Sequence, residues 1–462
     1  MDDIIAAIST PPGKGGIGII RLSGPGSVSL AEKFIAPKKG KPLSELTTRT
    51  LHLSVVRNSL TGAVIDEAFA VHMNEHSSYT GEEMVEIQCH GSPFVLREIL
   101  SSVIKSGARI AEPGEFTKRA FLNGKMDLTE AEAVQSLINA GTRKSGECAL
   151  RQLSGGLHEK IEGIRLKIVD ILSELEASID FPEEEIELPR LKEKISALDV
   201  INKEIAGLIK GALAGRILRE GYLCVIAGRA NVGKSSLFNR ILDYERAIVT
   251  EIPGTTRDFI VEGIELNGYP VKLADTAGIM EGKDKAEEES IRRSFDILKN
   301  ADLVLFVIDA SEGISIEDRE IYSEIVKESE EVRMITVLNK TDLEKKVNFD
   351  GAVKEFKSLG TVGVSAKDGT GIDKLTEEIA RAIEDELSGI DMEITVNMRH
   401  RDCLQRVSEA VGSAINLIEG GGSEEFAADD LKASLRALEE ITGKTFTDEV
   451  LDRIFESFCI GK

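Results

Sequence analysis

One stretch of the chain has the residue types and the spacing of a phosphate-binding loop. It reads Gly228-Arg229-Ala230-Asn231-Val232-Gly233-Lys234-Ser235. The glycines allow successive backbone N–H groups to face a phosphate. In such loops the lysine, here Lys234, reaches the β- and γ-phosphates, and the hydroxyl that follows, here Ser235, binds Mg²⁺. The nucleotide contacts that we predict from this loop are Asn231, Val232, Gly233, Lys234, Ser235 and Ser236.

Three further motifs follow in the order that a guanine-nucleotide site requires. They are Asp275-Thr276-Ala277-Gly278, Asn339-Lys340-Thr341-Asp342 and Ser365-Ala366-Lys367. We expect Asp275 to hold the same Mg²⁺ through water and the backbone of Gly278 to sense the γ-phosphate. The carboxylate of Asp342 can accept two hydrogen bonds from the ring N–H and the amine of guanine, and adenine lacks that pair of donors. The sequence therefore predicts GTP and GDP as ligands. The remaining predicted contacts are Thr276, Ala277, Asn339, Lys340, Ser365, Ala366 and Lys367.

A threonine-rich segment between the phosphate loop and the next strand occupies the place of the first switch. It reads Thr250-Glu251-Ile252-Pro253-Gly254-Thr255-Thr256-Arg257-Asp258. A threonine in this segment usually completes the magnesium shell. Thr256 is the better candidate, with Thr255 beside it. The predicted nucleotide contacts of this segment are Thr250, Thr255 and Thr256.

The residue after the Asp-x-x-Gly motif bears on how hydrolysis is catalysed. Many regulatory GTPases place a water-orienting Gln there, whereas this chain has Ile279. An apolar side chain cannot orient water, so catalysis must come from elsewhere. Asn231 suggests that a K⁺ held at the loop supplies positive charge, and Arg257 is a rival source. An amide that only stabilises the loop is the alternative interpretation of Asn231.

The charge of the chain limits what it can bind alone. Its 462 residues carry a formal net charge of −23. This charge excludes a protein that coats nucleic acid unaided, because phosphate contacts need clustered Lys and Arg. The charge is uneven, since residues 1–123 contain 13 Lys and Arg against 13 Asp and Glu. If RNA is a substrate, this neutral part or a basic partner must help to hold it.

The sequence carries no signal for export, for a membrane or for a transition metal. The acidic N-terminus lacks the basic region and apolar core of a signal peptide. No apolar run approaches the roughly 20 residues that span a bilayer. The five cysteines form no CxxC pair, and the six histidines have no ligand spacing. Scattered thiols of this kind predict a reducing, cytoplasmic location without a membrane partner.

The pattern of apolar and polar residues changes three times along the chain and predicts a multidomain α/β fold. Strand-like runs at residues 18–22 and 84–88 predict an N-terminal α+β domain over residues 1–123. Apolar seams from Ile161 to Leu175 and from Leu404 to Ile418 predict packed helices. Buried parallel strands are predicted at 222–227, 271–274, 303–308 and 334–338. We therefore expect a P-loop α/β GTPase domain (217–384) inserted into a discontinuous helical bundle (124–216 and 385–462).

Beyond the nucleotide motifs, the chain resembles the tRNA modification GTPase MnmE (TrmE) family from end to end. The resemblance rests on Thr10–Gly18, on Pro113–Phe116 with Arg119–Asn123, on Ile179–Pro182, on Gly254–Asp258 and on the terminal Phe458-Cys459-Ile460-Gly461-Lys462. Thousands of GTPases share the nucleotide motifs. The N-terminal block and the Cys-Ile-Gly-Lys tail are far more diagnostic.

The resemblance implies a homodimer formed through the N-terminal domains, with GTPase domains that pair when K⁺ and GTP bind. It also implies a partner flavoprotein of the MnmG (GidA) type, which carries the FAD, in a heterotetramer or larger complex. That complex would install an aminomethyl or carboxymethylaminomethyl group on C5 of the wobble uridine of tRNA. The one-carbon unit would come from 5-formyl- or methylene-tetrahydrofolate.

Single residues are carried over from the family by position. The potassium ligands implied by the resemblance are Asn231, Thr250, Ile252 and Thr255. Glu287 matches the residue that positions the attacking water, although Glu288 and Glu289 offer carboxylates beside it. A solvated acidic helix start is the alternative.

The same comparison implies a folate pocket in the N-terminal domain. Its residues would be Arg21, Glu86, Lys125 and Lys462. A carboxylate can accept from the N–H groups of a pterin, and cations can pair with the glutamate tail of the folate. From the sequence alone, Arg21 and Lys125 would be surface charges.

Cys459 completes the predicted catalytic set with Glu287 and Lys234. It stands four residues from the end of the chain, but Gly461 and Lys462 fit a prenylation signal badly. A buried core thiol is one interpretation of Cys459. We favour a position that faces the folate pocket.

Two other functions stay open from the sequence. A GTP-dependent ribosome-assembly factor without modifying chemistry would share the nucleotide domain, but such proteins usually add a basic RNA-binding module. Alternatively, the N-terminal domain serves only for dimerisation, which would leave Arg21, Glu86 and Lys125 with structural roles.

Overall fold

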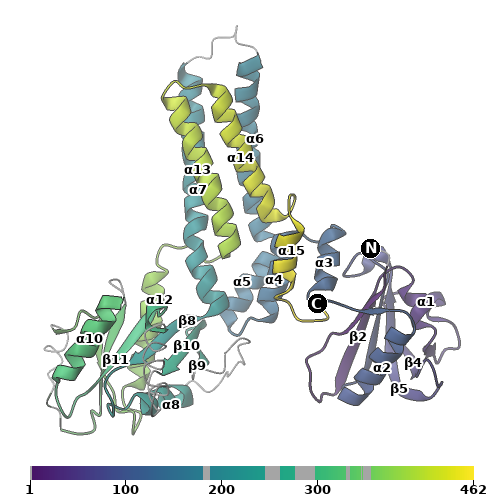
Figure 1. The fold of residues 1–462 in the computed structure, drawn as a ribbon, viewed down its shortest axis with the longest axis horizontal. Coiled ribbons are helices and arrows are strands. Elements are labelled where there is room, and N and C mark those ends of the chain that lie inside the picture. Colours follow the sequence, from purple (N-terminus) through teal and green to yellow (C-terminus); the bar gives the residue numbers. More distant parts are fainter. Residues whose placement is uncertain are drawn as a thin grey trace, which may run out of the picture. The chain divides into compact units, whose positions relative to one another are not determined.

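The computed structural model describes residues 3–180, 188–244, 261–275, 297–328, 333–344, 346 and 355–462. The chain forms two compact units. One consists of Met1–Gln135 with Arg436–Lys462, and the other of Ser136–Leu435. The predicted fold class is confirmed, because the chain has an N-terminal α+β part and an α/β part with a mostly parallel sheet, and long helices lie before and after the latter (Figure 1).

A seven-stranded sheet in the order β3-β4-β5-β6-β2-β1-β7 is the base of the first unit. Its strands are β1 (Ile5–Ile8), β2 (Ile17–Ser23), β3 (Ile35–Pro37), β4 (His52–Arg57), β5 (Val64–Met73), β6 (Met84–His90) and β7 (Arg109–Ile110). The short segments between them are α1 (Ser27–Ala31), η1 (Leu43–Glu45) and η2 (Glu75–Ser77). The predicted strand runs lie within β2 and β6, which pair in antiparallel fashion and place Arg21 directly opposite Glu86.

The helix α2 (Pro93–Lys105) gives this sheet its core. Its buried residues Leu96, Ile99 and Val103 pack with the sheet residues Ile20 and Val85. Alternation along β2 turns Arg21 to the face opposite Ile20. The sheet therefore has one apolar face under α2 and one face that carries charged side chains.

A second, smaller core joins segments from both ends of the first unit. It lies among α3 (Glu115–Leu122), α4 (Leu128–Ile138) and α15 (Asp448–Phe455). Its buried side chains are Phe121, Leu128, Ala131, Leu451, Phe455 and Phe458. The chain after α15 then returns to the sheet, because Ile460 forms an antiparallel bridge with Pro113 and the Phe116 N–H donates to the carbonyl of Lys462 at 3.2 Å.

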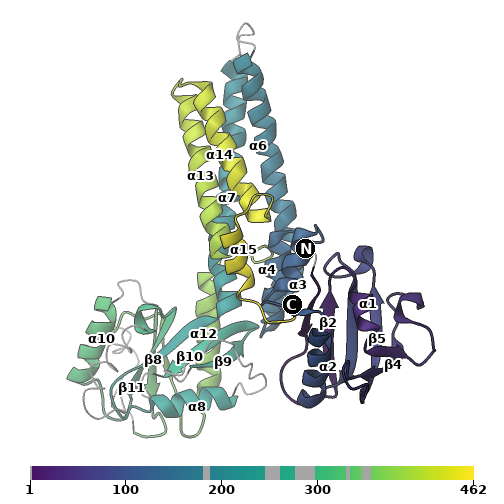
Figure 2. The ribbon, with the colours of Figure 1, turned by 45° about the vertical axis from the view of Figure 1, so that its right-hand side comes forward.

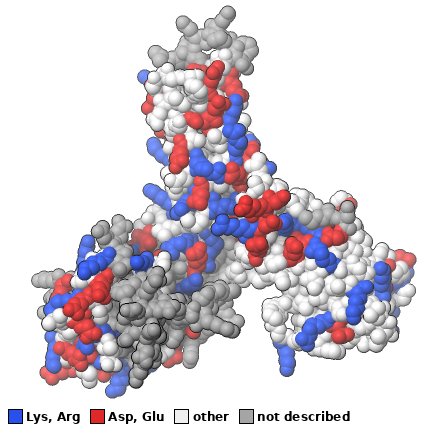
Figure 3. Space-filling model, viewed as in Figure 1, with Lys and Arg blue, Asp and Glu red and all other residues white. Residues whose placement is uncertain are grey.

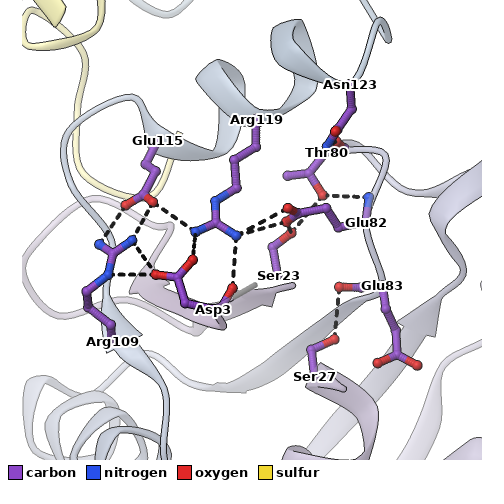
Figure 4. Close-up of polar contacts among 10 residues, drawn as sticks. All are labelled: Asp3, Ser23, Ser27, Thr80, Glu82, Glu83, Arg109, Glu115, Arg119 and Asn123. Atoms are coloured by element: carbon purple, nitrogen blue, oxygen red, sulfur yellow. Dashed lines mark hydrogen bonds and ion pairs between the residues drawn. The ribbon is translucent and has the colours of Figure 1, made fainter. Parts of the chain in front are cut away.

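A buried arginine holds the N-terminal segment against α3 (Figure 4). Arg119 is 1% exposed. Its Nη2 donates to Asp3 Oδ1 at 2.7 Å and to Glu115 Oε1 at 3.0 Å, and its Nη1 donates to Glu82 at 3.2 Å. Arg109 bonds the same Asp3 and Glu115 carboxylates from the other side. Burial raises the pKa of both carboxyls, but the arginine hydrogen bonds outweigh it, so each pKa lies below its ordinary value.

A six-stranded sheet in the order β13-β12-β11-β8-β10-β9 lies in the second unit. Its strands are β8 (Tyr222–Ala227), β9 (Val261–Leu266), β10 (Tyr269–Asp275), β11 (Leu303–Asp309), β12 (Met334–Asn339) and β13 (Gly360–Gly363). All pairs are parallel except β9 with β10. The four predicted buried strands are confirmed as β8, β10, β11 and β12. Their apolar side chains pack beside α8 (Lys234–Tyr244), α10 (Ile316–Glu328) and α12 (Ile372–Glu386).

Long helices form the rest of the second unit (Figure 2). They are α5 (Arg143–Leu153), α6 (Gly156–Asp180), α7 (Leu188–Glu220), α13 (Met398–Glu419) and α14 (Glu424–Thr442), the last as far as Leu435. The predicted seams of α6 and α13 are buried along their whole length. Acidic and basic side chains are mixed on the outside of these helices (Figure 3). No helix in the described part of the chain has the length and apolarity needed to cross a bilayer.

The helix ends bear on the predicted domain boundaries. α6 ends at Asp180, two residues before Pro182, and the residue before a proline avoids the helical backbone region. The boundary predicted between 216 and 217 falls inside α7, and that between 384 and 385 falls inside α12. The four predicted domain segments stay a prediction. Two of their boundaries lie within continuous helices, so the structure shows no break in the chain at those positions.

We predict that Arg119→Met destabilises the first unit by about 3–5 kcal/mol, because the mostly buried carboxylates of Glu82 and Glu115 lose the guanidinium that lies between them. The folded pKa values of Asp3 and Glu115 lie below their ordinary values of 3.8 and 4.5. These groups therefore stabilise the wild type above roughly pH 4.5, and the contribution is lost as the pH falls through the folded pKa values. Urea unfolding at pH 7, and at pH values stepped down from about 4.5 to below the folded pKa values, measures both effects.

Arg143→Met is the matched control, because Arg143 and Glu147 form an exposed ion pair with the same four-residue spacing. It should change the free energy of unfolding by less than about 1 kcal/mol. An Arg119→Met protein with wild-type stability and an unchanged pH dependence would contradict the role of the buried network.

Candidate functional site

The predicted phosphate loop connects β8 to α8 at the carboxyl edge of the second sheet. Gly228 has φ 149° and Gly233 has φ 97°. A Cβ atom at Gly228 would lie 2.4 Å from the Val307 carbonyl oxygen, and one at Gly233 would lie 2.3 Å from Asn339 Nδ2. Neither contact is possible for a side-chain carbon, so both positions require glycine.

The lysine of the loop is buried and already oriented. Lys234 is 5% exposed. Its Nζ donates to the carbonyl oxygens of Gly228 and Arg229, both at 2.8 Å. Burial lowers the pKa of Lys234, and the charge of Asp275 opposes this change. An ammonium has three N–H donors, so these two bonds fix the direction of the group while it keeps the capacity to bind a phosphate.

The predicted magnesium ligands lie at the same edge of the sheet. Asp275 is the last residue of β10, which runs parallel to β8, and it is buried. Ser235 is exposed in the first turn of α8. Because parallel strands end at one edge of a sheet, Asp275 and the loop that follows β8 face the same region.

The base side of the site is held by a buried amide. Asn339 Nδ2 donates to the Val232 carbonyl at 2.7 Å, and Asn339 Oδ1 accepts from the Ala366 N–H at 3.0 Å. Ser365 Oγ donates to Asp342 Oδ1 at 2.9 Å. A cavity of about 480 Å³ opens beside these groups. Its lining residues are Gly233, Ser236, Asn239, Arg240, Asp243, Asn339, Lys340, Asp342, Leu343, Ala366 and Lys367.

Lys340 joins the base side to the phosphate loop. Its Nζ donates to the Asn231 carbonyl at 2.9 Å and pairs with Asp309 Oδ2 at 2.6 Å. Asp309 is 2% exposed, and its Oδ1 accepts from the N–H and the hydroxyl of Ser311. Burial raises the pKa of Asp309, but the bonds from Lys340 and Ser311 outweigh it and hold that pKa below its ordinary value.

Several predicted site residues lie outside the described residues. They are Thr250, Ile252, Thr255, Thr256, Thr276, Ala277, Gly278 and Glu287, together with Arg257, Ile279, Glu288 and Glu289. Their predicted roles stay predictions. Among the residues that the structure does describe, no group of three or more His, Cys, Asp or Glu side chains could hold a metal ion.

Three of the four predicted folate residues meet in the first unit. The guanidinium of Arg21 bonds Glu86 Oε1 at 2.9 Å and 2.8 Å, and both side chains are mostly buried. Arg21 also lies over the ring of Phe116 at 5.6 Å. Burial lowers the pKa of Lys462, the charge of Arg21 lowers it further, and Glu86 opposes the change. The structure therefore brings Arg21, Glu86 and Lys462 within electrostatic range of one another.

The fourth residue, Lys125, stands apart from that ion pair. Its Nζ donates to the His76 carbonyl at 3.1 Å, and its side chain lies beside Gly81. Cys459 is exposed, so the interpretation as a buried core thiol is wrong. Cys459 lies close enough to Lys462 to raise the pKa of the lysine. The Cys459 thiol therefore lies near Lys462, and its predicted position at a folate pocket stays a prediction.

Comparison with known proteins covers both units. A family model described as the GTP-binding protein TrmE N-terminus matches residues 4–125, and one described as the MnmE helical domain matches residues 128–459. The relative from Carboxydothermus hydrogenoformans, named tRNA modification GTPase MnmE, is 42% identical over the full length of both chains. Relatives of the same name from Symbiobacterium thermophilum and Aquifex aeolicus are 43% and 44% identical, again over both full lengths.

This chain belongs to the MnmE family. The two matched ranges include the phosphate loop and the Arg21–Glu86 pair. The nucleotide motifs alone, shared with many other GTPases, could not have decided this.

Sequence reasoning missed several residues of the site in this MnmE family member. Asp309, which pairs with Lys340, is the last residue of the apolar strand β11, so its position in the sequence indicates only the end of a buried strand. Arg240 donates to the carbonyls of Ala366 and Lys367, and thereby fixes the fourth nucleotide motif, Ser365-Ala366-Lys367. Its position on α8, two turns after the phosphate loop, was the available signal. Asn239, Asp243 and Leu343 line the cavity without belonging to any motif.

Proposed function

We propose that this chain is a K⁺-activated GTP hydrolase that acts in tRNA modification. The strongest support is that an MnmE relative matches this chain over the full length of both sequences at 42% identity. The four nucleotide motifs of this chain are also complete. Asp342 would recognise the guanine, Asn339 and Lys340 would support the site, and Lys234 would bind the β- and γ-phosphates. The chain would act in the cytoplasm.

The described residues fit Mg²⁺ at the phosphate loop. Ser235 is exposed there, and Asp275 ends the adjacent strand. Ser235 and Thr256 would hold Mg²⁺, and Asn231, Thr250, Ile252 and Thr255 would hold K⁺. When bound, these ions supply positive charge that offsets the charge developing on the transferred phosphoryl group. Asn231 supports this assignment with a φ of 63° and a carbonyl fixed by Lys340. Glu287 would position the attacking water.

We further propose that the first unit binds a reduced folate and that the modification takes place in a larger complex. Arg21, Glu86, Lys125 and Lys462 would hold 5-formyl- or methylene-tetrahydrofolate, with Cys459 at the edge of the pocket. The chain would form a homodimer and act with an MnmG-type flavoprotein that carries the FAD. Together they would add an aminomethyl or carboxymethylaminomethyl group to C5 of the wobble uridine.

The tRNA of cells that lack the gene tests the function itself. We expect loss of the C5-aminomethyl-type uridines at the wobble position, measured by mass spectrometry of tRNA nucleosides. The intact gene should restore them. An Asp275→Ala copy should not, because Asp275 lies at the predicted magnesium site. An unchanged nucleoside profile in the deletion strain would instead favour the ribosome-assembly function.

The salt dependence of turnover tests the role of K⁺. Replacement of K⁺ by Na⁺ should lower GTP turnover by about tenfold or more, since an equivalent positive charge from an arginine accelerates other GTPases by far more than this. Asn231→Ala should remove most of the difference between the two salts. Glu287→Ala is the control, because it should bind nucleotide normally in K⁺ and still lose turnover. Equal rates in K⁺ and Na⁺ would move the role to Arg257.

Folate binding can be measured by calorimetric titration with 5-formyl-tetrahydrofolate. Glu86→Gln should weaken binding by about tenfold, which is about 1.4 kcal/mol, because glutamine keeps the size of the side chain and loses its charge. Glu67→Gln is the matched control, since Glu67 is an exposed carboxylate of the same sheet that pairs with Lys38. Wild-type affinity in Glu86→Gln would leave the first unit as a dimerisation module.

A further inference from the structure

An arginine of the phosphate loop is held from outside the four nucleotide motifs. Arg229 follows Gly228, and its side chain is 15% exposed. Its Nη2 bonds Glu312, and its Nε lies 3.4 Å from Asp318 Oδ1. Glu312 lies in the turn between β11 and α10, and Asp318 lies in the first turn of α10. Two carboxylates of the β11–α10 segment (residues 309–318) therefore hold this guanidinium.

The pairing with Asp318 is buried and specific. Asp318 has no exposed surface. Its Oδ2 accepts from the N–H and the hydroxyl of Ser315 at the start of α10. Within the described residues, Asp318 Oδ1 and Arg229 Nε have no hydrogen-bond partner, so the contact between these two atoms is one of charge alone. Removal of a charge from such a pair leaves its partner buried and uncompensated.

The backbone of the same arginine orients the catalytic lysine. The Arg229 carbonyl accepts from Lys234 Nζ at 2.8 Å. The direction of that carbonyl depends on the peptide between residues 229 and 230, which the anchored side chain restrains. The Arg229 guanidinium itself is neutralised by two carboxylates, so it is not available as the positive charge of the transition state.

The β11–α10 segment also reaches the loop at a second point. Its first residue, Asp309, pairs with Lys340, and Lys340 donates to the Asn231 carbonyl. Both ends of the Arg229–Asn231 stretch are therefore tied to residues 309–318. The anchoring carboxylates, Asp309, Glu312 and Asp318, belong to no nucleotide motif.

We propose that Arg229 is a positioning residue for GTP hydrolysis, which acts through Lys234 and is held in place by Glu312 and Asp318. This rests on the proposed GTPase function and adds a positioning residue to its site. Loss of the guanidinium frees the Arg229 carbonyl and thus the ammonium of Lys234. The affinity for the β-phosphate and the rate of hydrolysis then fall together.

The test is Arg229→Met in the full-length protein. We expect the Kd for GDP, measured with a fluorescent GDP analogue in Mg²⁺, to rise about tenfold, and the kcat for GTP in K⁺ to fall by a similar factor. Arg229→Lys should recover part of both losses, because lysine can pair with one carboxylate but cannot bond two in a fork. Arg319→Met is the matched control, since Arg319 is the next residue of α10 after Asp318 and pairs with Glu355. It should leave both constants within twofold of wild type.

Asp318→Asn keeps the proposal testable if Arg229→Met does not fold. Asparagine can still accept from Ser315 through its oxygen but no longer carries the charge that faces Arg229. It should raise the Kd for GDP several-fold while far-ultraviolet circular dichroism stays unchanged. Folded Arg229→Met or Asp318→Asn with wild-type Kd and kcat would overturn the proposal. The GDP measurement needs neither tRNA nor K⁺, so failure of the proposed tRNA role or of K⁺ activation would not affect this result.

Discussion

The nucleotide-binding half of this molecule depends on one buried amide. Asn339 stands at the end of β12, and its two side-chain atoms satisfy the Val232 carbonyl and the Ala366 N–H. Each of these backbone groups lies in a loop that lacks regular structure of its own. A buried amide that bonds both loops fixes their separation, and an unsatisfied group at either end would cost about 1–3 kcal/mol. The width of the cavity beside Asp342 follows from this bridge.

Charged pairs extend that constraint outward. Lys340, the neighbour of Asn339, bonds Asp309 and the phosphate loop, and Arg229 ties the same loop to Asp318. The loop that must accept a phosphate is thus fixed by its glycines, by an amide and by charged contacts from two other segments, residues 309–318 and Lys340. A rigid loop loses little conformational freedom when a nucleotide binds, which favours affinity.

Much of this architecture could be predicted from the sequence, because its signals are local. The buried runs of β8, β10, β11 and β12 and the apolar seams of α6 and α13 have the periodicity of their elements. The motif residues that lie close in space were predicted from spacing alone. The ion pairs could not be predicted, since Arg119 meets Asp3 and Arg229 meets Asp318 through tertiary contacts that leave no periodic trace. Cys459 was ambiguous for the same reason, because its exposure depends on the path of the tail across the sheet.

The first compact unit is assembled from both ends of the described chain, and this affects how it is made. Phe121 and Leu128 pack on Leu451 and Phe455, and Ile460 bridges Pro113. During synthesis, residues 1–135 leave the ribosome long before residues 436–462 exist. At about 5–20 residues per second, the apolar side chains of Phe121 and Leu128 stay uncovered by the C-terminal helix for a time on the order of tens of seconds. The second unit has no such delay, because residues 136–435 are consecutive. The nucleotide-binding half can therefore fold while the half that carries Arg21 and Glu86 is still incomplete on the ribosome.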